Sequence, residues 1–175
     1  MSRLHRLVVC ERGYSLVELL QVTLILAVVL GALTTVFVRA MNSEVEMNQR
    51  FLAQQEARVA VDKMRREIHC ASAITGNAQS ITVTLPGQCP TAVAKALTTV
   101  VYDVQPVSAG RWQLRRAGVR LADYVTVQNV FTYNAPVTGK RGNLHVELPI
   151  NVRANQSGQT WRLVADIVLR NTTRL

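Results

Sequence analysis

An uncharged run of twenty residues, which begins at Leu19 and ends at Val38, constrains this chain more than any other feature. As an α-helix, twenty residues extend about 30 Å, the thickness of the hydrocarbon core of a bilayer. Apolar residues already begin at Leu16, so we predict a membrane-spanning helix over residues 14–38. Glu18 lies near its start, and an acid inside such a segment costs about 2.5–3.5 kcal/mol on insertion scales. Glu18 is therefore expected to have a partner or a function.

A short basic leader precedes this run. Arg3, Arg6 and Arg12 outweigh the one acid, Glu11, in residues 1–13. Positive residues before a span favour a cytoplasmic N-terminus, which places the chain beyond residue 39 outside the membrane. We therefore predict a single-pass protein of the cytoplasmic, or inner, membrane.

Two other interpretations of the N-terminus remain. A secretory signal peptide would have an apolar region of about 7–15 residues followed by a small-residue cleavage site. Here the run is longer, and Ala40 is the small residue available after it. A plain single-pass anchor would explain the length of the run, but not Gly13 or Glu18.

The helix is predicted to continue to Cys70. No proline occurs between Ser15 and Cys70, and Gly31 is the only glycine there. Opposite charges four residues apart indicate a solvated helical face; these pairs are Glu46/Arg50, Asp62/Arg66 and Lys63/Glu67. Apolar residues also recur with helical spacing; they are Met41, Val45, Ala57, Val61, Met64 and Ile68. Residues 39–70 are therefore predicted to form an amphipathic continuation of the helix.

After Cys70 the sequence changes to short β-rich segments between turn residues. The predicted strands cover residues 80–85, 98–104, 111–115, 125–133, 144–152 and 160–169. Apolar and polar residues alternate in 81–85 and 144–148, which predicts an antiparallel sheet with one buried face. Pro106 is expected to separate two strands, and Pro149 indicates an edge strand or a break. Residues 71–175 are predicted to form an extracytoplasmic β domain, packed on the apolar stripe of the helix in an α+β fold.

The sequence Arg12-Gly13-Tyr14-Ser15-Leu16-Val17-Glu18, followed by the apolar run, resembles the class III signal sequence of type IV prepilins and type II secretion pseudopilins. The resemblance implies a pilin-like fold and a leader, residues 1–13, that a membrane-embedded prepilin peptidase removes between Gly13 and Tyr14. It also implies N-methylation of the new Tyr14 amine and pairing of Glu18 with the Tyr14 amine of a neighbouring subunit. Tyr14 stands where phenylalanine is usual in the family. Snorkelling of Glu18 to the headgroup layer is the alternative role of this acid.

A second, weaker resemblance lies downstream. Residues 57–68 are similar to the helix end of J-type pseudopilins and W-type minor pilins. Tyr102, the runs 112–116 and 121–125, and the segment 131–133 follow the order of that group. The implied function is a structural minor pilin or pseudopilin of a type IV pilus or type II secretion pseudopilus. Its partners would be the prepilin peptidase, other pilins or pseudopilins, an inner-membrane assembly platform and membrane lipid.

Charge motivates an alternative function. The formal net charge is +9, and removing the leader's +2 leaves +7 on residues 14–175. This charge suits acidic lipid or DNA, so a DNA-binding minor pilin of a competence machine is the alternative. A plain anchored extracytoplasmic domain is a third candidate.

The cysteines fall into two groups. Cys10 lies in the leader, whereas Cys70 and Cys89 follow the span, on the side where disulfides persist. We predict that Cys70 and Cys89 pair and tie the helix end to the sheet; two unpaired buried thiols are the alternative.

The remaining chemistry-bearing residues point away from catalysis. The histidines, His5, His69 and His145, lack metal-ligand spacing, and no Cys-x-x-Cys or His-Glu-x-x-His occurs. His69 is expected to cap the helix or to lie at the surface. Because no phosphate loop, nucleophile elbow or carboxylate cluster is present, we predict no enzyme activity, no metal and no cofactor.

Overall fold

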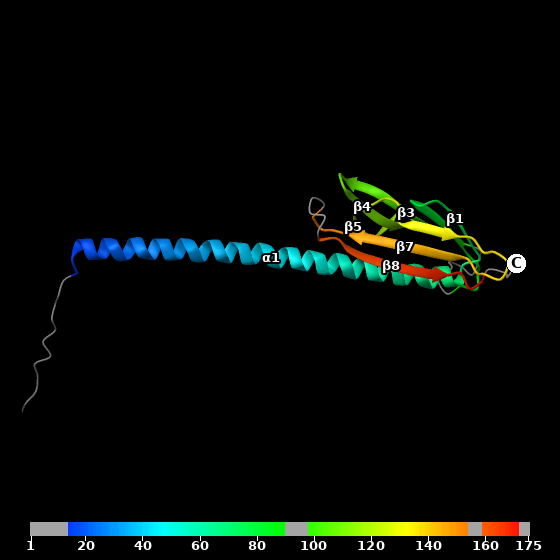
Figure 1. The fold of residues 1–175 in the computed structure, drawn as a ribbon, viewed down its shortest axis with the longest axis horizontal. Helices are drawn as coiled ribbons and strands as arrows, with labels where there is room; N and C mark the ends of the chain where they lie inside the picture. The colour runs from blue at the N-terminus through cyan, green and yellow to red at the C-terminus, as the bar shows by residue number, and fades with distance from the viewer. Residues whose placement is uncertain (1–13, 90–97, 154–158, 172–175) are drawn as a thin grey trace, which may run out of the picture. The chain divides into compact units, whose positions relative to one another are not determined.

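The computed structural model describes residues 14–89, 98–153 and 159–171 of the 175-residue chain. The described part contains one long helix, α1 (Leu16–Cys70), and eight strands in one sheet (Figure 1). The chain divides into two compact units, Met1–Val45 and Glu46–Leu175. The helix therefore begins in the first unit and ends in the second, at the predicted residue Cys70.

In the first unit, α1 has no cover from the rest of the described chain. Every side chain of residues 16–45 is exposed, although most are apolar. By length and composition this helix can cross a membrane. The hydroxyls of Thr23, Thr34 and Thr35 donate hydrogen bonds to helical carbonyl oxygens three or four residues earlier, at 2.8–2.9 Å. These polar groups are therefore satisfied within the helix, as an apolar environment requires.

The second unit is an antiparallel sheet on the last turns of α1. Its strands are β1 (Ala73–Gly76), β2 (Ser80–Leu85), β3 (Thr98–Ser108), β4 (Arg111–Arg116), β5 (Val119–Val125), β6 (Phe131–Asn134), β7 (Asn143–Ile150) and β8 (Trp161–Val168). Their order is β1-β2-β3-β4-β5-β7-β6, and β8 pairs with the other edge of β7. The sheet curls, so that the Ala78 carbonyl oxygen, between β1 and β2, accepts the N–H groups of Val130 and Phe131, at the start of β6, at 2.9 and 3.1 Å.

The core lies between α1 and this sheet. The predicted stripe residues Val61, Met64 and Ile68 are buried, at most 3% exposed. The helix runs along β8 (Figure 1), with Arg58 over the ring of Trp161 and His69 Nδ1 2.9 Å from the Val168 carbonyl oxygen. The helix contributes Ala53, Ala57 and Ala60 as well, and the strands contribute residues such as Tyr102, Leu114, Leu148 and Ile167. The predicted α+β arrangement is confirmed.

The prediction of one strand over residues 125–133 is wrong. β5 ends at Val125 and β6 begins at Phe131, so residues 126–130 leave the sheet. The N–H of Thr126 donates to the Pro149 carbonyl oxygen at 3.0 Å, and Glu147 N–H donates to the Val130 carbonyl oxygen at 3.0 Å. Between these two bonds, Pro149 offers no N–H to the neighbouring strand. The interruption between β5 and β6 therefore lies opposite Pro149.

The prediction for Pro149 itself must also be corrected. β7 is not an edge strand, since it pairs with β8 on one side and with β5 and β6 on the other. Pro149 is tolerated because the side of β7 that lacks its N–H faces the interruption between β5 and β6. Pro106, expected between strands, lies inside β3. It lies beyond Asp103, the last β3 residue paired with β2, where β3 has only β4 as a neighbour.

Candidate functional site

The N-terminal motif occupies the start of α1. Gly13 and the predicted leader lie outside the described residues. Tyr14 is 81% exposed, and the carbonyl oxygen of Ser15 accepts the Leu19 N–H at 3.1 Å, which makes Ser15 the N-cap. Glu18 is then the third helical residue, so Ser15 and Glu18 have the spacing of a capping box. An acid in the first helical turn also interacts favourably with the helix dipole.

Glu18 is the only charged residue from Tyr14 to Val38. Within the part of the chain that the structure describes, its carboxylate has no ion-pair partner. Leu16, Leu19 and Val38, the predicted membrane positions, are likewise exposed. The predicted pairing of Glu18 with a neighbouring Tyr14 remains a prediction.

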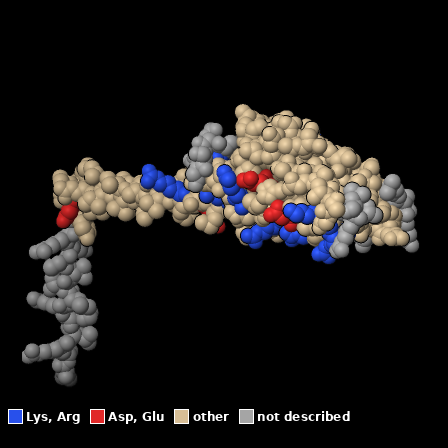
Figure 2. Space-filling view, turned by 45° about the vertical axis from the view of Figure 1, so that its right-hand side comes forward, with Lys and Arg blue, Asp and Glu red and all other residues tan. Residues whose placement is uncertain are grey.

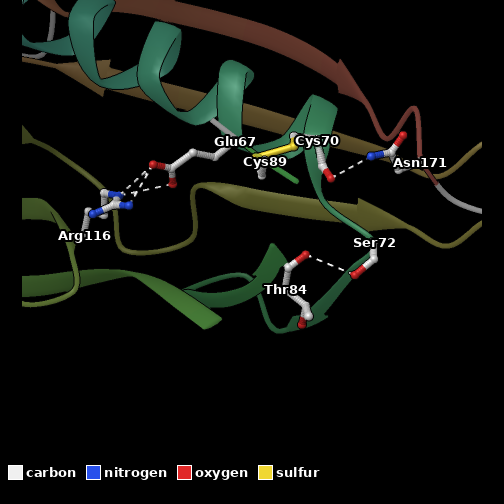
Figure 3. The surroundings of a disulfide bond; sticks show 7 residues. All are labelled: Glu67, Cys70, Ser72, Thr84, Cys89, Arg116 and Asn171. Carbon is white, nitrogen blue, oxygen red and sulfur yellow. Dashed lines mark hydrogen bonds and ion pairs between the residues drawn. A yellow bond between two sulfur atoms is a disulfide. The ribbon is translucent and has the colours of Figure 1, made fainter. Parts of the chain in front are cut away.

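Cys70 and Cys89 form the predicted disulfide (Figure 3). Their Cα atoms are 5.7 Å apart, and the bond joins the last residue of α1 to the turn after β2. The chain on either side is also held. Asn171 Nδ2 donates to the Cys70 carbonyl oxygen at 3.0 Å, and Ser72 donates its N–H and its hydroxyl to the Thr84 carbonyl oxygen. His69 Nδ1 lies 2.9 Å from the Val168 carbonyl oxygen of β8, so this side chain contacts the sheet rather than a carbonyl of the helix end. The helix end is therefore fixed covalently and by hydrogen bonds.

One turn before the disulfide, Glu67 is fully buried. Its carboxylate accepts a hydrogen bond from the Tyr102 hydroxyl at 2.6 Å. The Arg116 guanidinium donates to the same carboxylate, with Nε at 3.0 and 3.1 Å and Nη2 at 2.8 Å (Figure 3). We call Glu67, Tyr102 and Arg116 the junction cluster. It joins α1 to β3 and β4 through the interior of the domain.

The junction cluster shifts the pKa of two of its members. Burial raises the pKa of the Tyr102 hydroxyl far above its ordinary value, and the hydrogen bond to the Glu67 carboxylate adds to the increase. The hydrogen bond to Glu67 raises the pKa of Arg116, although burial opposes it. Both groups therefore keep their protons, and both act as donors to one carboxylate.

The prediction that Glu67 pairs with Lys63 on a solvated face is wrong. Opposite charges four residues apart are compatible with any helix face, and their spacing does not say which face is covered. Helical phase carries the missing signal, because Glu67 follows Ala60 by seven residues and Met64 by three, and both of these are buried. The other two predicted pairs lie outside the core. Glu46 and Arg50 form the predicted ion pair. The Asp62 carboxylate pairs with Arg65 at 3.1 Å instead of with Arg66, whose Nε donates to the Asp62 backbone carbonyl oxygen at 3.3 Å.

A second polar cluster lies at β4 and β5. Asp123 is 3% exposed and accepts two hydrogen bonds from Arg111, at 2.9 and 2.5 Å, one from Gln113 and one from the Tyr124 N–H. Burial raises the pKa of Asp123, but these hydrogen bonds outweigh it and hold the pKa below its ordinary value. Tyr124 adopts φ 60°, and Arg111 stacks on its ring at 4.0 Å from the centroid. These contacts lie at a β-bulge of β5, where its register with β4 shifts between Ala122 and Val125.

The second unit carries basic and acidic side chains close to one another. Figure 2 shows acidic side chains among the basic ones on the visible face. Within the described residues, seven arginines form ion pairs with acids; they are Arg50, Arg65, Arg111, Arg116, Arg120, Arg153 and Arg162. Such pairing lowers the charge that these arginines offer to phosphates, and the DNA-binding alternative remains a prediction.

The described residues contain no group of three or more His, Cys, Asp or Glu side chains that could hold a metal ion. His145 instead contacts Asp166, at 2.8 Å, on the exposed face of the sheet. Comparisons of the chain with protein-family models, curated proteins and solved structures found no match.

Proposed function

We propose that this chain is a structural subunit of the pilin type, a minor pilin or pseudopilin that is built into a type IV filament or a type II secretion pseudopilus. One combination of features supports the proposal. The helix α1 is apolar and uncovered over residues 16–38, it packs on an antiparallel sheet over its last turns, and it follows the Gly13-Tyr14 motif with Glu18 in its first turn. Such a helix needs lipid before assembly and other helices after it.

In the proposed sequence of events, the subunit first inserts into the inner membrane with its N-terminus in the cytoplasm. Prepilin peptidase cleaves after Gly13, where the absence of a side chain lets the enzyme grip the backbone, and methylates the Tyr14 amine. The mature subunit then enters the filament at the assembly platform. There Glu18 pairs with the Tyr14 ammonium of a neighbour, because two charges in an apolar environment attract strongly.

Processing is tested by mass spectrometry of the mature protein expressed with a prepilin peptidase. The expected first residue is an N-methylated Tyr14. Gly13→Val should block cleavage and leave membrane insertion unchanged, because insertion depends on the apolar run and the basic leader. An intact Met1 with the peptidase present would favour a plain anchor, and a mature N-terminus near Ala40 would favour a secretory signal. Either result contradicts the proposal.

Assembly is tested with Glu18→Val, and Glu44→Val outside the apolar run is the matched control. Glu18→Val should be cleaved normally and inserted more easily, since it removes the charge from the membrane segment. It should be missing from sheared filaments or crosslinked pseudopilus complexes, because the ammonium of its neighbour would lack a counter-charge at a cost of about 3–5 kcal/mol. Incorporation of Glu18→Val at the level of the control would refute the pairing and favour snorkelling.

A further inference from the structure

The strand β8 is an edge of the sheet that no other described strand covers. It pairs with β7 over all eight of its residues, without a shift of register. Edge strands of native proteins are usually very short, or carry a proline or a bulge. The other open edges of the described sheet follow this rule, because β1 and β6 have four residues each and the free end of β3 carries Pro106 and a register shift. Among the described strands, β8 therefore offers the long and regular edge.

The hydrogen bonds of β7 show which backbone groups of β8 point away from the sheet. The Glu147 N–H and the Pro149 carbonyl oxygen both bond on the side of β5 and β6. Leu148, between them, therefore turns its backbone groups to β8, where it pairs with Leu163. Successive residues of a strand alternate in this respect. The backbone groups of Leu163 face β7, and those of Val164 face outward.

By the same alternation, the outward groups of β8 belong to Arg162, Val164, Asp166 and Val168. The helix α1 takes up one of them, because His69 Nδ1 lies 2.9 Å from the Val168 carbonyl oxygen. No other described residue bonds to the outward N–H and C=O groups of Val164 and Asp166. These groups form a template on which one more strand can add to the sheet.

Side chains on the outer face of β8 define what such a strand should carry. Arg162 and Asp166 lie on either side of Val164, and their side chains are 71% and 63% exposed. Each contacts β7, Arg162 with Glu147 and Asp166 with His145, but most of each side chain remains in water. Antiparallel pairing suits this antiparallel sheet and is slightly more stable per residue than parallel pairing. Opposite charges directly across two strands stabilise the pair, and like charges destabilise it.

A second copy of this chain does not fit the edge within one membrane. The helix α1 and β8 run in the same direction, because Arg58 lies over the ring of Trp161 at the start of β8 and His69 contacts Val168 at its end. Two β8 strands that paired antiparallel would therefore point their helices in opposite directions. Subunits that are anchored in one membrane through α1 share the direction of this helix. The added strand must then come from a different protein.

We propose that the outer edge of β8 is a docking site for an extended segment of another protein, which adds to the sheet as an antiparallel strand. The segment carries an acid opposite Arg162, a β-branched apolar residue opposite Val164 and a base opposite Asp166. Main-chain hydrogen bonds to Val164 and Asp166 supply the affinity, and the two charges select the register. The site lies in the second unit alone, and it holds whether or not the subunit enters a filament.

The sequence of β8 itself supplies the probe, a free peptide of residues 160–169. When this peptide lies antiparallel to β8 with its Val164 opposite that of the chain, its Arg162 faces Asp166 and its Asp166 faces Arg162. The peptide has no helix, so the restriction on direction does not apply to it. The charge-swapped peptide, Arg162→Asp/Asp166→Arg, has the same composition but sets like charges against β8. It is therefore the matched control.

Binding of each fluorescently labelled peptide to the full chain in detergent micelles is measured by anisotropy, and hydrogen exchange with mass spectrometry locates it. The unswapped peptide should bind at least about tenfold more tightly than the swapped one, and it should slow exchange of the Val164 and Asp166 amides. The same swap in the chain, Arg162→Asp/Asp166→Arg, should reverse the preference by a similar factor. Exposed ion pairs contribute little to stability, so this variant should unfold at the temperature of the parent.

Three results would overturn the proposal. If neither peptide binds, the edge does not accept a strand. If both bind the parent chain equally, or bind without protecting β8, the charges on β8 do not select the partner. If the swapped chain keeps the preference of the parent, binding belongs to another surface. The comparison of the two peptides on the parent chain needs no variant of the protein, so it decides the question even if the swapped chain does not fold.

Discussion

Breaking the disulfide should lower the stability of the second unit by an amount that follows from the loop it closes. Cys70 and Cys89 are separated by 19 positions in the sequence. In the chain-entropy model, closing a loop of about 20 residues removes about 11 cal/mol/K from the unfolded state, which is about 3 kcal/mol at 25 °C. For a unit of this size, 1 kcal/mol corresponds to about 4 °C, so the midpoint should fall by about 12 °C.

The assay compares thermal and urea unfolding of a soluble fragment that begins near Glu44. Three forms are needed: the oxidised parent, the reduced parent, and Cys70→Ala/Cys89→Ala. The reduced parent loses the bond but keeps both sulfur atoms, one of which, in Cys89, is buried. The double variant loses the bond and that packing. We expect the reduced parent to lose about 3 kcal/mol and the double variant to lose somewhat more.

The reasoning fails if the reduced parent unfolds within about 1 kcal/mol of the oxidised form, since loop closure would then contribute much less than the model requires. A loss confined to the alanine variant would assign the stabilisation to packing of the Cys89 sulfur. Titration of the oxidised fragment in denaturant should find no free thiol, and two thiols per chain would contradict the bond itself.

The remaining predictions concern packing, backbone and pH. Met64→Ala should lower the unfolding free energy by about 2–5 kcal/mol, measured in urea, whereas Val59→Ala, at a position 58% exposed, should change it by less than about 0.5 kcal/mol. Gly76→Ala should cost about 1–3 kcal/mol, because φ is +134° and a Cβ would lie 2.2 Å from the Ser80 carbonyl oxygen; an unchanged midpoint would refute this. Asp123 has a lowered pKa, so its contribution should be present above its unfolded pKa of about 3.9 and lost as the pH falls through the lower folded value. Stability measured from pH 7 to pH 2 should then fall less steeply in Asp123→Asn than in the parent, and identical curves would exclude this role.

Local pattern was sufficient for the helix and for most strands. The predicted helix end, Cys70, and the predicted strand 80–85 match the observed α1 and β2. Two strand segments left no local signal. β1 (Ala73–Gly76) has four residues and one buried side chain, too few for alternation to be visible. β5 (Val119–Val125) contains a β-bulge at Tyr124, whose φ is positive. The bulge interrupts the alternation of buried and exposed side chains along the strand.

The candidate sites divide in the same way. Gly13, Tyr14 and Glu18 are recognised by order and spacing alone, and the cysteines by their position after the span. The junction cluster could not be recognised from order and spacing, because the partners of Glu67 lie 35 and 49 positions away, on different strands.

By itself, therefore, the sequence determined a membrane-length apolar helix, its continuation to Cys70, and a β-rich domain after it. These features follow from the local spacing of apolar and polar residues, because each side chain has its own preference for water or for apolar surroundings. Only the tertiary structure decided that β7 is central despite Pro149, and that Glu67 is buried against Arg116. The energetic cost of a buried charge or of a missing N–H depends on the residues that pack against it, and those residues are distant in the chain.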